Sequence, residues 1–204
     1  MIILLTAGAF LSGAILFSYG LGLAAKKNIR AVGDGNPGAL NLWKAAGYRL
    51  GLLGIALDFL KGYLPVLWLA GTEYAEGTRL VPLALAPIAG HAFSPFLKGR
   101  GGKAIAVTFG VWSALTAFEA SLAYAIVLAL LAAAVRLGRR GRTVSAASDG
   151  LQVTGGMLLL GLYLLLRGFS PPLLGIWIGN LAIVVYKHRT ELASWLGRKR
   201  RGAL

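Results

Sequence analysis

Long apolar segments separated by short polar ones run the length of the chain, and this alternation restricts the possible folds more than any other feature. A helix that crosses a bilayer needs about 20 mainly apolar residues. Seven segments approach or reach this length, namely residues 2–25, 50–70, 79–97, 104–117, 119–135, 149–166 and 171–186. Because the connections are short, we expect one all-α integral-membrane domain over residues 1–204 with seven transmembrane helices. The sequence does not define the boundary between the fourth and fifth segments.

The basic residues gather on one side of this arrangement. If the N-terminus lies outside, all but three of the 21 Lys and Arg residues fall in cytoplasmic segments. The exceptions are Arg79 and Arg167 in outside loops and Lys61 within a span. This bias predicts an external N-terminus and a cytoplasmic C-terminus. We do not expect a cleaved signal peptide, because the first basic residues, Lys26 and Lys27, follow the first apolar segment instead of preceding it.

The composition excludes several classes of function. A net charge of +14 in a soluble protein would suggest nucleic acid, but here the charges flank apolar segments. Anionic lipid headgroups and anionic substrates are therefore the expected partners, and nucleic acid is not. The absence of cysteine excludes disulfides and thiolate chemistry, and two histidines with seven acids supply a metal cage poorly. We therefore predict no metal and no cofactor.

The segment GHAFSPFLKGRGGKAIAVTFG, residues 90–110, concentrates glycines and basic side chains between two apolar segments. Arg100, Gly101, Gly102 and Lys103 resemble a phosphate cradle, because glycine lets backbone N–H groups approach an anion and lysine adds charge. The spacing differs from a nucleotide P-loop, since Ala104 follows the lysine. The alternative is a basic loop that only sets membrane topology, and the loop by itself does not separate the two.

The other polar motifs also fall on the predicted cytoplasmic face. GDGNPGALN, residues 33–41, indicates a structured turn, after which residues 39–46 are expected to form a short interfacial helix. Asn36, Asn41 and Lys44 in this region are candidate phosphate ligands. The basic residues after Trp195 are interpreted as a headgroup anchor.

Two further motifs carry hydroxyl and imidazole groups. Ser145 and Ser148 precede the sixth span, where a hydroxyl can bind an oxyanion, although helix capping is the better interpretation of these serines alone. His188, next to Arg189, is either a general base or an interfacial histidine. Without a nucleophilic cysteine or a Ser-His-Asp order, any catalysis must rely on positioning and electrostatics.

Within the spans, Asp58 and Lys61 lie three residues apart, share a helix face and are expected to pair. Their predicted role is structural, as is that of His91. A proton relay is less favoured, because no further acidic residue within a span extends the pair.

Five motifs, in order, resemble the membrane acyltransferases that move an acyl group from acyl phosphate to sn-glycerol 3-phosphate. IRAVGDGNPGALNLWKAAG resembles the family pattern IRxxGSGNxGATNxxRxxG, and LDFLKGYLPV resembles its second span. GHAFSPFLKGRGGKAIAVTFG resembles GHxFpxFLxFKGGKGVATxxG, VSAAS resembles VSLxS, and YKHRTEL resembles the terminal HRxNI. The resemblance covers nearly the whole chain. It implies a seven-helix fold with a cytoplasmic active site and direct attack on acyl phosphate, without an acyl-enzyme or metal.

The resemblance also implies site residues and departures from the family. Lys103, Ser148 and His188 match family positions of the phosphate pocket. The family serine of GSGN is Asp34 here, the arginine is Lys44 and the asparagine of HRxN is Glu191. Two carboxylates near a phosphate are unfavourable unless they are paired or protonated. Three outcomes follow: a different substrate, pairing of Asp34 and Glu191 with Lys103, Lys44 or Arg189, or loss of activity.

The function that the resemblance implies is acylation of the 1-hydroxyl of glycerol 3-phosphate. The expected product is 1-acyl-glycerol 3-phosphate, formed at the cytoplasmic face of the inner membrane in the first step of phospholipid biosynthesis. The alternatives are a catalytically impaired paralogue that binds lipid or another acceptor, and a small membrane transporter. The sequence indicates neither the oligomeric state nor the acyl-chain length.

Overall fold

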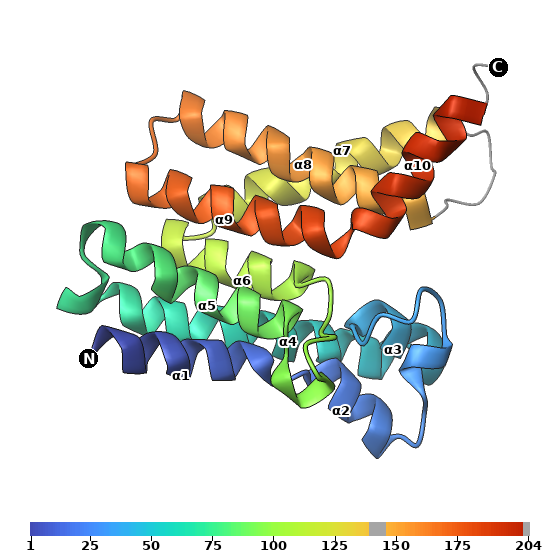
Figure 1. Ribbon diagram of the computed structural model, residues 1–204, viewed down its shortest axis with the longest axis horizontal. Coiled ribbons are helices and arrows are strands. Elements are labelled where there is room, and N and C mark those ends of the chain that lie inside the picture. The colour runs from blue at the N-terminus through green and yellow to red at the C-terminus, as the bar shows by residue number, and fades with distance from the viewer. Residues whose placement is uncertain (139–145, 202–204) are drawn as a thin grey trace.

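The computed structural model describes residues 1–138 and 146–201, apart from the side chains of residues 146–148 and 198–201, and all regular secondary structure in these ranges is helical. The longer helices run side by side in two layers (Figure 1). Their bounds are α1 Ile2–Ala14, α4 Tyr48–Ala70, α5 Leu80–Ala92, α6 Ile105–Thr116, α7 Glu119–Gly138, α8 Ala146–Leu166 and α9 Pro171–Lys187. The two short helices α2 Phe17–Ala24 and α3 Ala39–Ala46, together with α10 Arg189–Arg201, gather at the end of the bundle opposite the N-terminus.

Five stretches are long and apolar enough to cross a membrane: residues 2–24, 48–70, 77–97, 119–138 and 149–166. The remaining apolar helices, α6 and α9, are shorter. The described chain is thus an all-helical protein with several membrane-spanning candidates, and the expected segments all correspond to helices. The predicted interfacial helix matches α3.

The expected first span matches a membrane-spanning candidate, residues 2–24, but it is not one continuous helix, because a break at Ile15 and Leu16 divides it into α1 and α2. A break in an apolar environment leaves backbone carbonyls that need donors. Ser94 Oγ donates to the Ala14 carbonyl at 2.7 Å and Lys61 Nζ donates to the Ile15 carbonyl at 2.6 Å. Polar side chains from α4 and from the loop after α5 therefore stabilise the break.

The predicted pairing of Asp58 with Lys61 is confirmed. Lys61 Nζ lies 2.7 Å from Asp58 Oδ1, and Ser18 Oγ donates to Asp58 Oδ2 at 2.5 Å. The pair therefore connects α4 with α2 and with the break before it, which is the anchoring role expected from the sequence.

The turn between α6 and α7 defines the boundary that the sequence left open. Ala117 and Phe118 both have positive φ, 45° and 72°, which ends α6 and starts α7 immediately afterwards. Ser113 Oγ donates to Ser121 Oγ across this turn at 2.8 Å. The fourth and fifth predicted spans are therefore separate helices joined by two residues.

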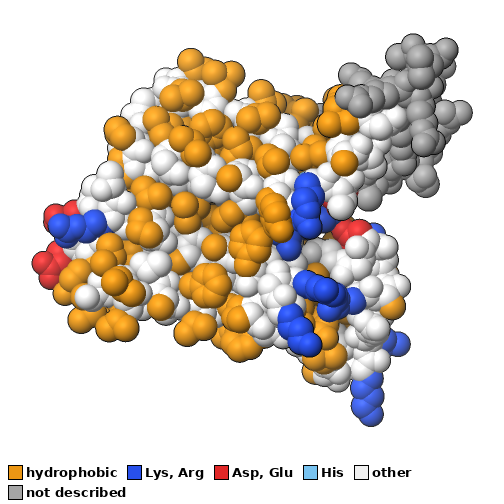
Figure 2. All heavy atoms as spheres, in the orientation of Figure 1, with side chains coloured by type: hydrophobic (Ala, Val, Ile, Leu, Met, Phe, Trp, Pro, Cys, Tyr) orange, Lys and Arg blue, Asp and Glu red, His pale blue; other side chains and the backbone are white. Residues whose placement is uncertain are grey.

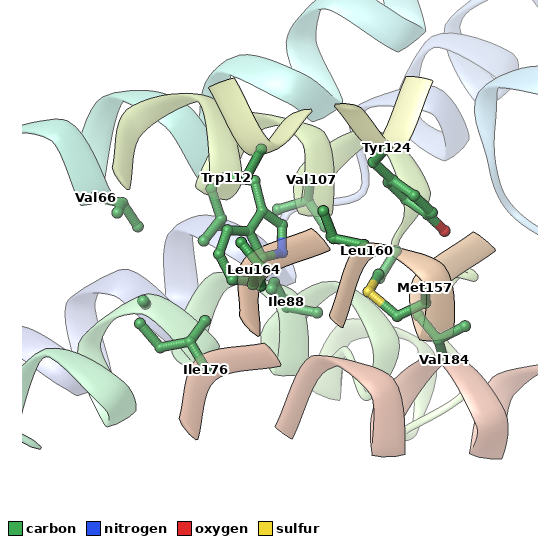
Figure 3. Close-up of a cluster of buried hydrophobic side chains, with 14 of the residues drawn as sticks. Val66, Ile88, Val107, Trp112, Tyr124, Met157, Leu160, Leu164, Ile176 and Val184 are labelled. Atoms are coloured by element: carbon green, nitrogen blue, oxygen red, sulfur yellow. The ribbon is translucent and has the colours of Figure 1, made fainter. Parts of the chain in front are cut away.

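A single main core joins the two layers (Figure 3). Trp112 of α6 is fully buried, and its indole N–H donates to Asn180 of α9 at 3.0 Å. Asn180 in turn donates to Thr108 Oγ1 at 3.2 Å. In the lower layer, a Cβ at Gly110 would overlap the Phe59 carbonyl, so glycine lets α4 and α6 approach closely.

Figure 2 shows how the surface matches this architecture. Apolar side chains cover the middle of the visible face, whereas most Lys and Arg side chains on it lie toward the end that holds α2, α3 and α10. Residues Arg189–Arg201 form α10, and the start of this helix brings Glu191 back to the bundle. The role of the basic residues after Trp195 as a headgroup anchor stays a prediction.

Candidate active site

The loop before α3 positions Asp34 at the polar end of the bundle. Gly33 and Gly35 adopt positive φ, 60° and 71°, which tightens the GDGN turn. Asp34 Oδ1 accepts from the Asn36 N–H at 3.1 Å and from Asn41 Nδ2 at 2.9 Å. Asn41 also donates to the Asn36 carbonyl at 2.9 Å and is buried. Both N–H groups of the Asn41 amide thus donate within the loop, so this side chain positions Asp34. Only the amide oxygen of Asn41 is left for its predicted contact with phosphate, and that oxygen can only accept a hydrogen bond.

Lys103 lies between two carboxylates that come from opposite ends of the chain. Its ammonium is 2.7 Å from Asp34 Oδ2 and 2.7 Å from Glu191 Oε1. Of the outcomes expected for Asp34 and Glu191, pairing with Lys103 is the one observed. A Cβ at Gly150 of α8 would lie 2.7 Å from the Glu191 Cβ, so close packing of α10 on α8 fixes where this carboxylate reaches.

The three charges of this cluster stabilise one another. Burial, the largest single influence, would by itself raise the pKa of Asp34 and of Glu191. The hydrogen bonds and the positive charge of Lys103, together with the other hydrogen bonds of each carboxylate, outweigh it and lower both pKa values. Burial alone would lower the pKa of Lys103, but its hydrogen bonds to the two carboxylates raise that pKa. All three groups are therefore ionised at neutral pH.

The loop that carries Lys103 is held from both sides. The Gly102 N–H donates to the His91 carbonyl at 3.0 Å, and Lys187 Nζ donates to the Ala92 and Gly101 carbonyls at 2.9 Å each. Side chains at Gly101 or Gly102 would overlap His91. The prediction that the Gly102 amide binds phosphate is therefore wrong: that N–H is already bonded, and glycine is needed here for close packing.

His188 is buried at the junction of α9 and α10. Its Nδ1 lies 2.9 Å from the Val184 carbonyl, which can only accept, so Nδ1 carries the proton of the neutral ring. Burial lowers the pKa of His188 below its ordinary value, and at neutral pH Nε2 therefore keeps a free lone pair. The structure therefore buries the imidazole that the sequence left as either a general base or an interfacial histidine.

Two cavities meet at Lys103. A polar one of about 530 Å³ is lined by side chains that include Asp34, Lys44, Asp149 and His188. An apolar one, also about 530 Å³, extends between α3, α4 and α6, where Trp43, Phe59 and Phe109 form its walls and Asp58 and His91 reach it. The cavities share Asn36, Leu40, Lys103 and Ile105. The site thus offers a charged chamber beside an apolar one of similar size.

The structure brings some predicted site residues together and leaves others apart. Asn36, Asn41, Lys44, Lys103 and His188 all line the polar cavity. Arg100 is exposed and, like Gly101 and Gly102, is absent from the lining of both cavities, so its position gives no support to the expected phosphate contact. Ser145 and the side chain of Ser148 lie outside the described residues, although residue 148 belongs to the first turn of α8.

Sequence reasoning missed three polar residues of this region. Asp149 and Gln152 line the polar cavity from α8, and Lys187 anchors the Lys103 loop. Two of these residues could have been found from their place next to a motif, because Asp149 follows directly after VSAAS and Lys187 directly precedes His188.

Known proteins resemble this chain over almost its entire length. The family profile described as glycerol-3-phosphate acyltransferase matches residues 3–197. Glycerol-3-phosphate acyltransferase 1 of Thermotoga maritima is 40% identical over 191 residues, which cover 92% of this chain and 94% of the relative. The protein of the same name from Trichlorobacter lovleyi is 35% identical over 187 residues, covering 92% and 90%.

The fold has solved counterparts as well. The crystal structure of PlsY (YgiH), an integral membrane glycerol 3-phosphate acyltransferase, in its glycerol 3-phosphate form, superposes with a TM-score of 0.81 and 28% identity, covering 96% of this chain and 92% of that one. Its lysophosphatidic acid form gives a TM-score of 0.80 with the same coverage. This chain belongs to the glycerol-3-phosphate acyltransferase family.

Proposed function

We propose that the protein transfers an acyl group from acyl phosphate to the 1-hydroxyl of sn-glycerol 3-phosphate, releasing phosphate and 1-acyl-glycerol 3-phosphate. The observation that carries this proposal is the meeting of a polar and an apolar cavity at Lys103. The reaction joins a charged head to an apolar chain, and the two chambers match these two chemistries. The family membership and the relatives' names point to the same reaction.

In this reaction the protein supplies position and charge, and the donor supplies its own leaving group. The acyl chain lies in the apolar cavity, with the carbonyl directed toward Lys103. Lys103 and Lys44 face the phosphate groups, while Asn36 offers an amide at the boundary between the cavities. His188 Nε2 is free to accept a hydrogen bond from a hydroxyl group.

The direct test is an assay of purified protein with acyl phosphate and labelled glycerol 3-phosphate. We expect lysophosphatidate to form and phosphate to be released in equal amounts. Binding of both substrates without product would indicate the impaired paralogue. Movement of glycerol 3-phosphate into proteoliposomes without acyl transfer would indicate the transporter.

The membrane arrangement belongs to the same proposal. We propose seven spans in the cytoplasmic membrane, with the N-terminus outside and the active site facing the cytoplasm, and the bias of Lys and Arg supports this. The chain contains no cysteine, so a thiol reagent labels only the cysteines that are introduced. Gly71→Cys and Gly197→Cys, both at exposed positions, should react with an impermeant thiol reagent from opposite sides of the membrane. Reaction from the same side would contradict the seven-span topology.

A further inference from the structure

The ammonium of Lys103 is already bound by two anionic groups of the protein itself. Asp34 and Glu191 each contact it at 2.7 Å, and all three side chains are more than two-thirds buried. An ammonium has three N–H donors, and two of them point to carboxylates here. A phosphate dianion that binds Lys103 has to displace at least one carboxylate or share the ammonium with both.

The rest of the polar cavity does not restore a positive potential. Its lining holds two carboxylates, Asp34 and Asp149, and two lysines, Lys44 and Lys103. Glu191, which is not part of the lining, adds a third carboxylate through its contact with Lys103. Lys44 forms no ion pair with any side chain in the described ranges. Because His188 is neutral, the three carboxylates exceed the two ammonium groups by one charge. Like charges brought together in a partly buried site repel, so beside the donor's phosphate this cavity favours a neutral acceptor over a second dianion.

We propose that this site also acylates uncharged polyols, that is, hydroxyl compounds of the glycerol type without a phosphate group, because Asp34 and Glu191 occupy the place on Lys103 that an acceptor's phosphate would take. The proposal rests on the acyl-phosphate reaction proposed above and extends its range of acceptors. Asp34 and Glu191 are then specificity-determining residues. They weaken the preference for a phosphorylated acceptor and leave the hydroxyl and the acyl donor to be recognised by other groups.

The chemical step balances with the same donor. The polyol oxygen attacks the carbonyl carbon of acyl phosphate and forms the ester C–O bond. The bond between the acyl carbon and the phosphate oxygen breaks, and phosphate leaves with the bonding electron pair. The hydroxyl proton ends on the released phosphate, so the products are a neutral acyl polyol and hydrogen phosphate. No oxidant, reductant or further reactant is needed.

The test compares two acceptors, glycerol and sn-glycerol 3-phosphate, with the same acyl phosphate in detergent micelles. We expect kcat/KM values for the two acceptors to lie within about tenfold of each other in the wild type. In Asp34→Ser/Glu191→Asn the ratio should shift by about tenfold or more toward glycerol 3-phosphate, because the competing carboxylates are gone. A third acceptor, a 1-O-alkylglycerol in the micelle, shows whether the polyol comes from water or from a lipid headgroup.

A matched control removes a carboxylate that pairs with a cation far from the cavities. Glu119→Gln breaks the ion pair with Arg167 at the other end of α7 and should leave the acceptor ratio unchanged. If the Ser/Asn variant does not fold, Asp34→Asn/Glu191→Gln removes the same charges with nearly the same shape.

The possible outcomes separate the two proposals. Acylation of glycerol 3-phosphate with no measurable acylation of either polyol, or an acceptor ratio that the charge-removing variants leave unchanged, would overturn the extended acceptor range and leave the proposed function standing. Failure of every acceptor to take the acyl group would overturn both.

Discussion

Two aspartate–lysine pairs have the same 2.7 Å separation but occupy very different surroundings. Asp58 and Lys61 lie inside the bundle, where Ser18 and the Ile15 carbonyl are further hydrogen-bond partners and Asp58 borders the apolar cavity. Asp34 and Lys103 lie beside a cavity, and a second carboxylate, Glu191, shares the lysine. The interior pair has fixed partners and holds helices together. The pair at the cavity has partners that a ligand can replace, so similar chemistry supports the fold in one place and binding in the other.

Removing the interior aspartate should have the largest effect on stability. Asp58→Ala leaves the Lys61 ammonium without its counter-ion in a water-poor environment, and breaking a buried pair costs about 3–5 kcal/mol. Thermal unfolding in detergent measures this loss. In Asp58→Asn/Lys61→Met, where both charges are absent, the loss should be smaller. A double variant as unstable as Asp58→Ala would show that the pair does more than compensate charge.

Removing the lysine at the cavity should affect activity more than stability. Lys103→Ala deletes the ammonium that faces the reacting phosphate, and losing such a group typically lowers kcat by about 100-fold or more. The melting temperature should fall less than in Asp58→Ala, because the carboxylates of Asp34 and Glu191 lie at the cavity and can turn toward water. Near wild-type transfer in Lys103→Ala would mean that the loop serves only topology.

The cluster at the cavity should contribute stability only within a defined pH range. The pKa values of Asp34 and Glu191 are lowered on folding, so their contribution is present above the ordinary values of 3.8 and 4.5 and disappears as the pH falls through the folded values. The pKa of Lys103 is raised, so its contribution is present below 10.5 and disappears as the pH rises through the folded value. The difference in melting temperature between the wild type and Asp34→Asn should therefore be constant near neutral pH and vanish in acid. A difference that persists in strong acid would mean that Asp34 acts through neutral hydrogen bonds.

The exposed pair supplies the smallest expected effect. Glu119 accepts from Arg167 at 3.0 Å at the surface, where solvent weakens the attraction. Arg167→Ala should leave both the melting temperature and acyl transfer unchanged within experimental error. A clear destabilisation would show that the contact of Glu119 with Tyr163 depends on Arg167.

Hydropathy and turn chemistry predicted the helices well, since each apolar segment became a helix and residues 39–46 became α3. The spacing of Asp58 and Lys61 was also sufficient to predict that their side chains pair, because residues three apart on a helix are neighbours. The break at Ile15 was not predictable, since it has no proline and depends on donors from distant α4 and the loop after α5. Glu191 reaches Lys103 only because α10 folds back, and a basic tail gives no sign of that turn.

The structure brings together predicted site residues that come from short motifs, and it adds residues from distant helices that the sequence did not indicate. GDGN and Lys103 were identified from their motifs, but the sequence left open which cation would pair with Asp34. Glycines in the Lys103 loop invited an anion-binding interpretation, whereas their contact with His91 is a matter of packing. Local patterns indicate which polar groups are present, and only the tertiary structure shows which of these groups already have hydrogen-bond partners within the protein.

The short length of α6 bears on where in the bilayer this chemistry takes place. Its 12 residues rise about 18 Å at 1.5 Å per residue, well short of the hydrocarbon thickness of about 30 Å. If the C-terminal end of α6 lies at the outer surface of the hydrocarbon layer, Lys103, just before the first turn of α6, is therefore expected within that layer, on the inner side of the cytoplasmic headgroups. A donor could then present its carbonyl without lifting its chain out of the membrane, whereas the water-soluble acceptor must descend to meet it. A thicker bilayer would lengthen that descent, so the apparent affinity for the acceptor should depend on lipid chain length.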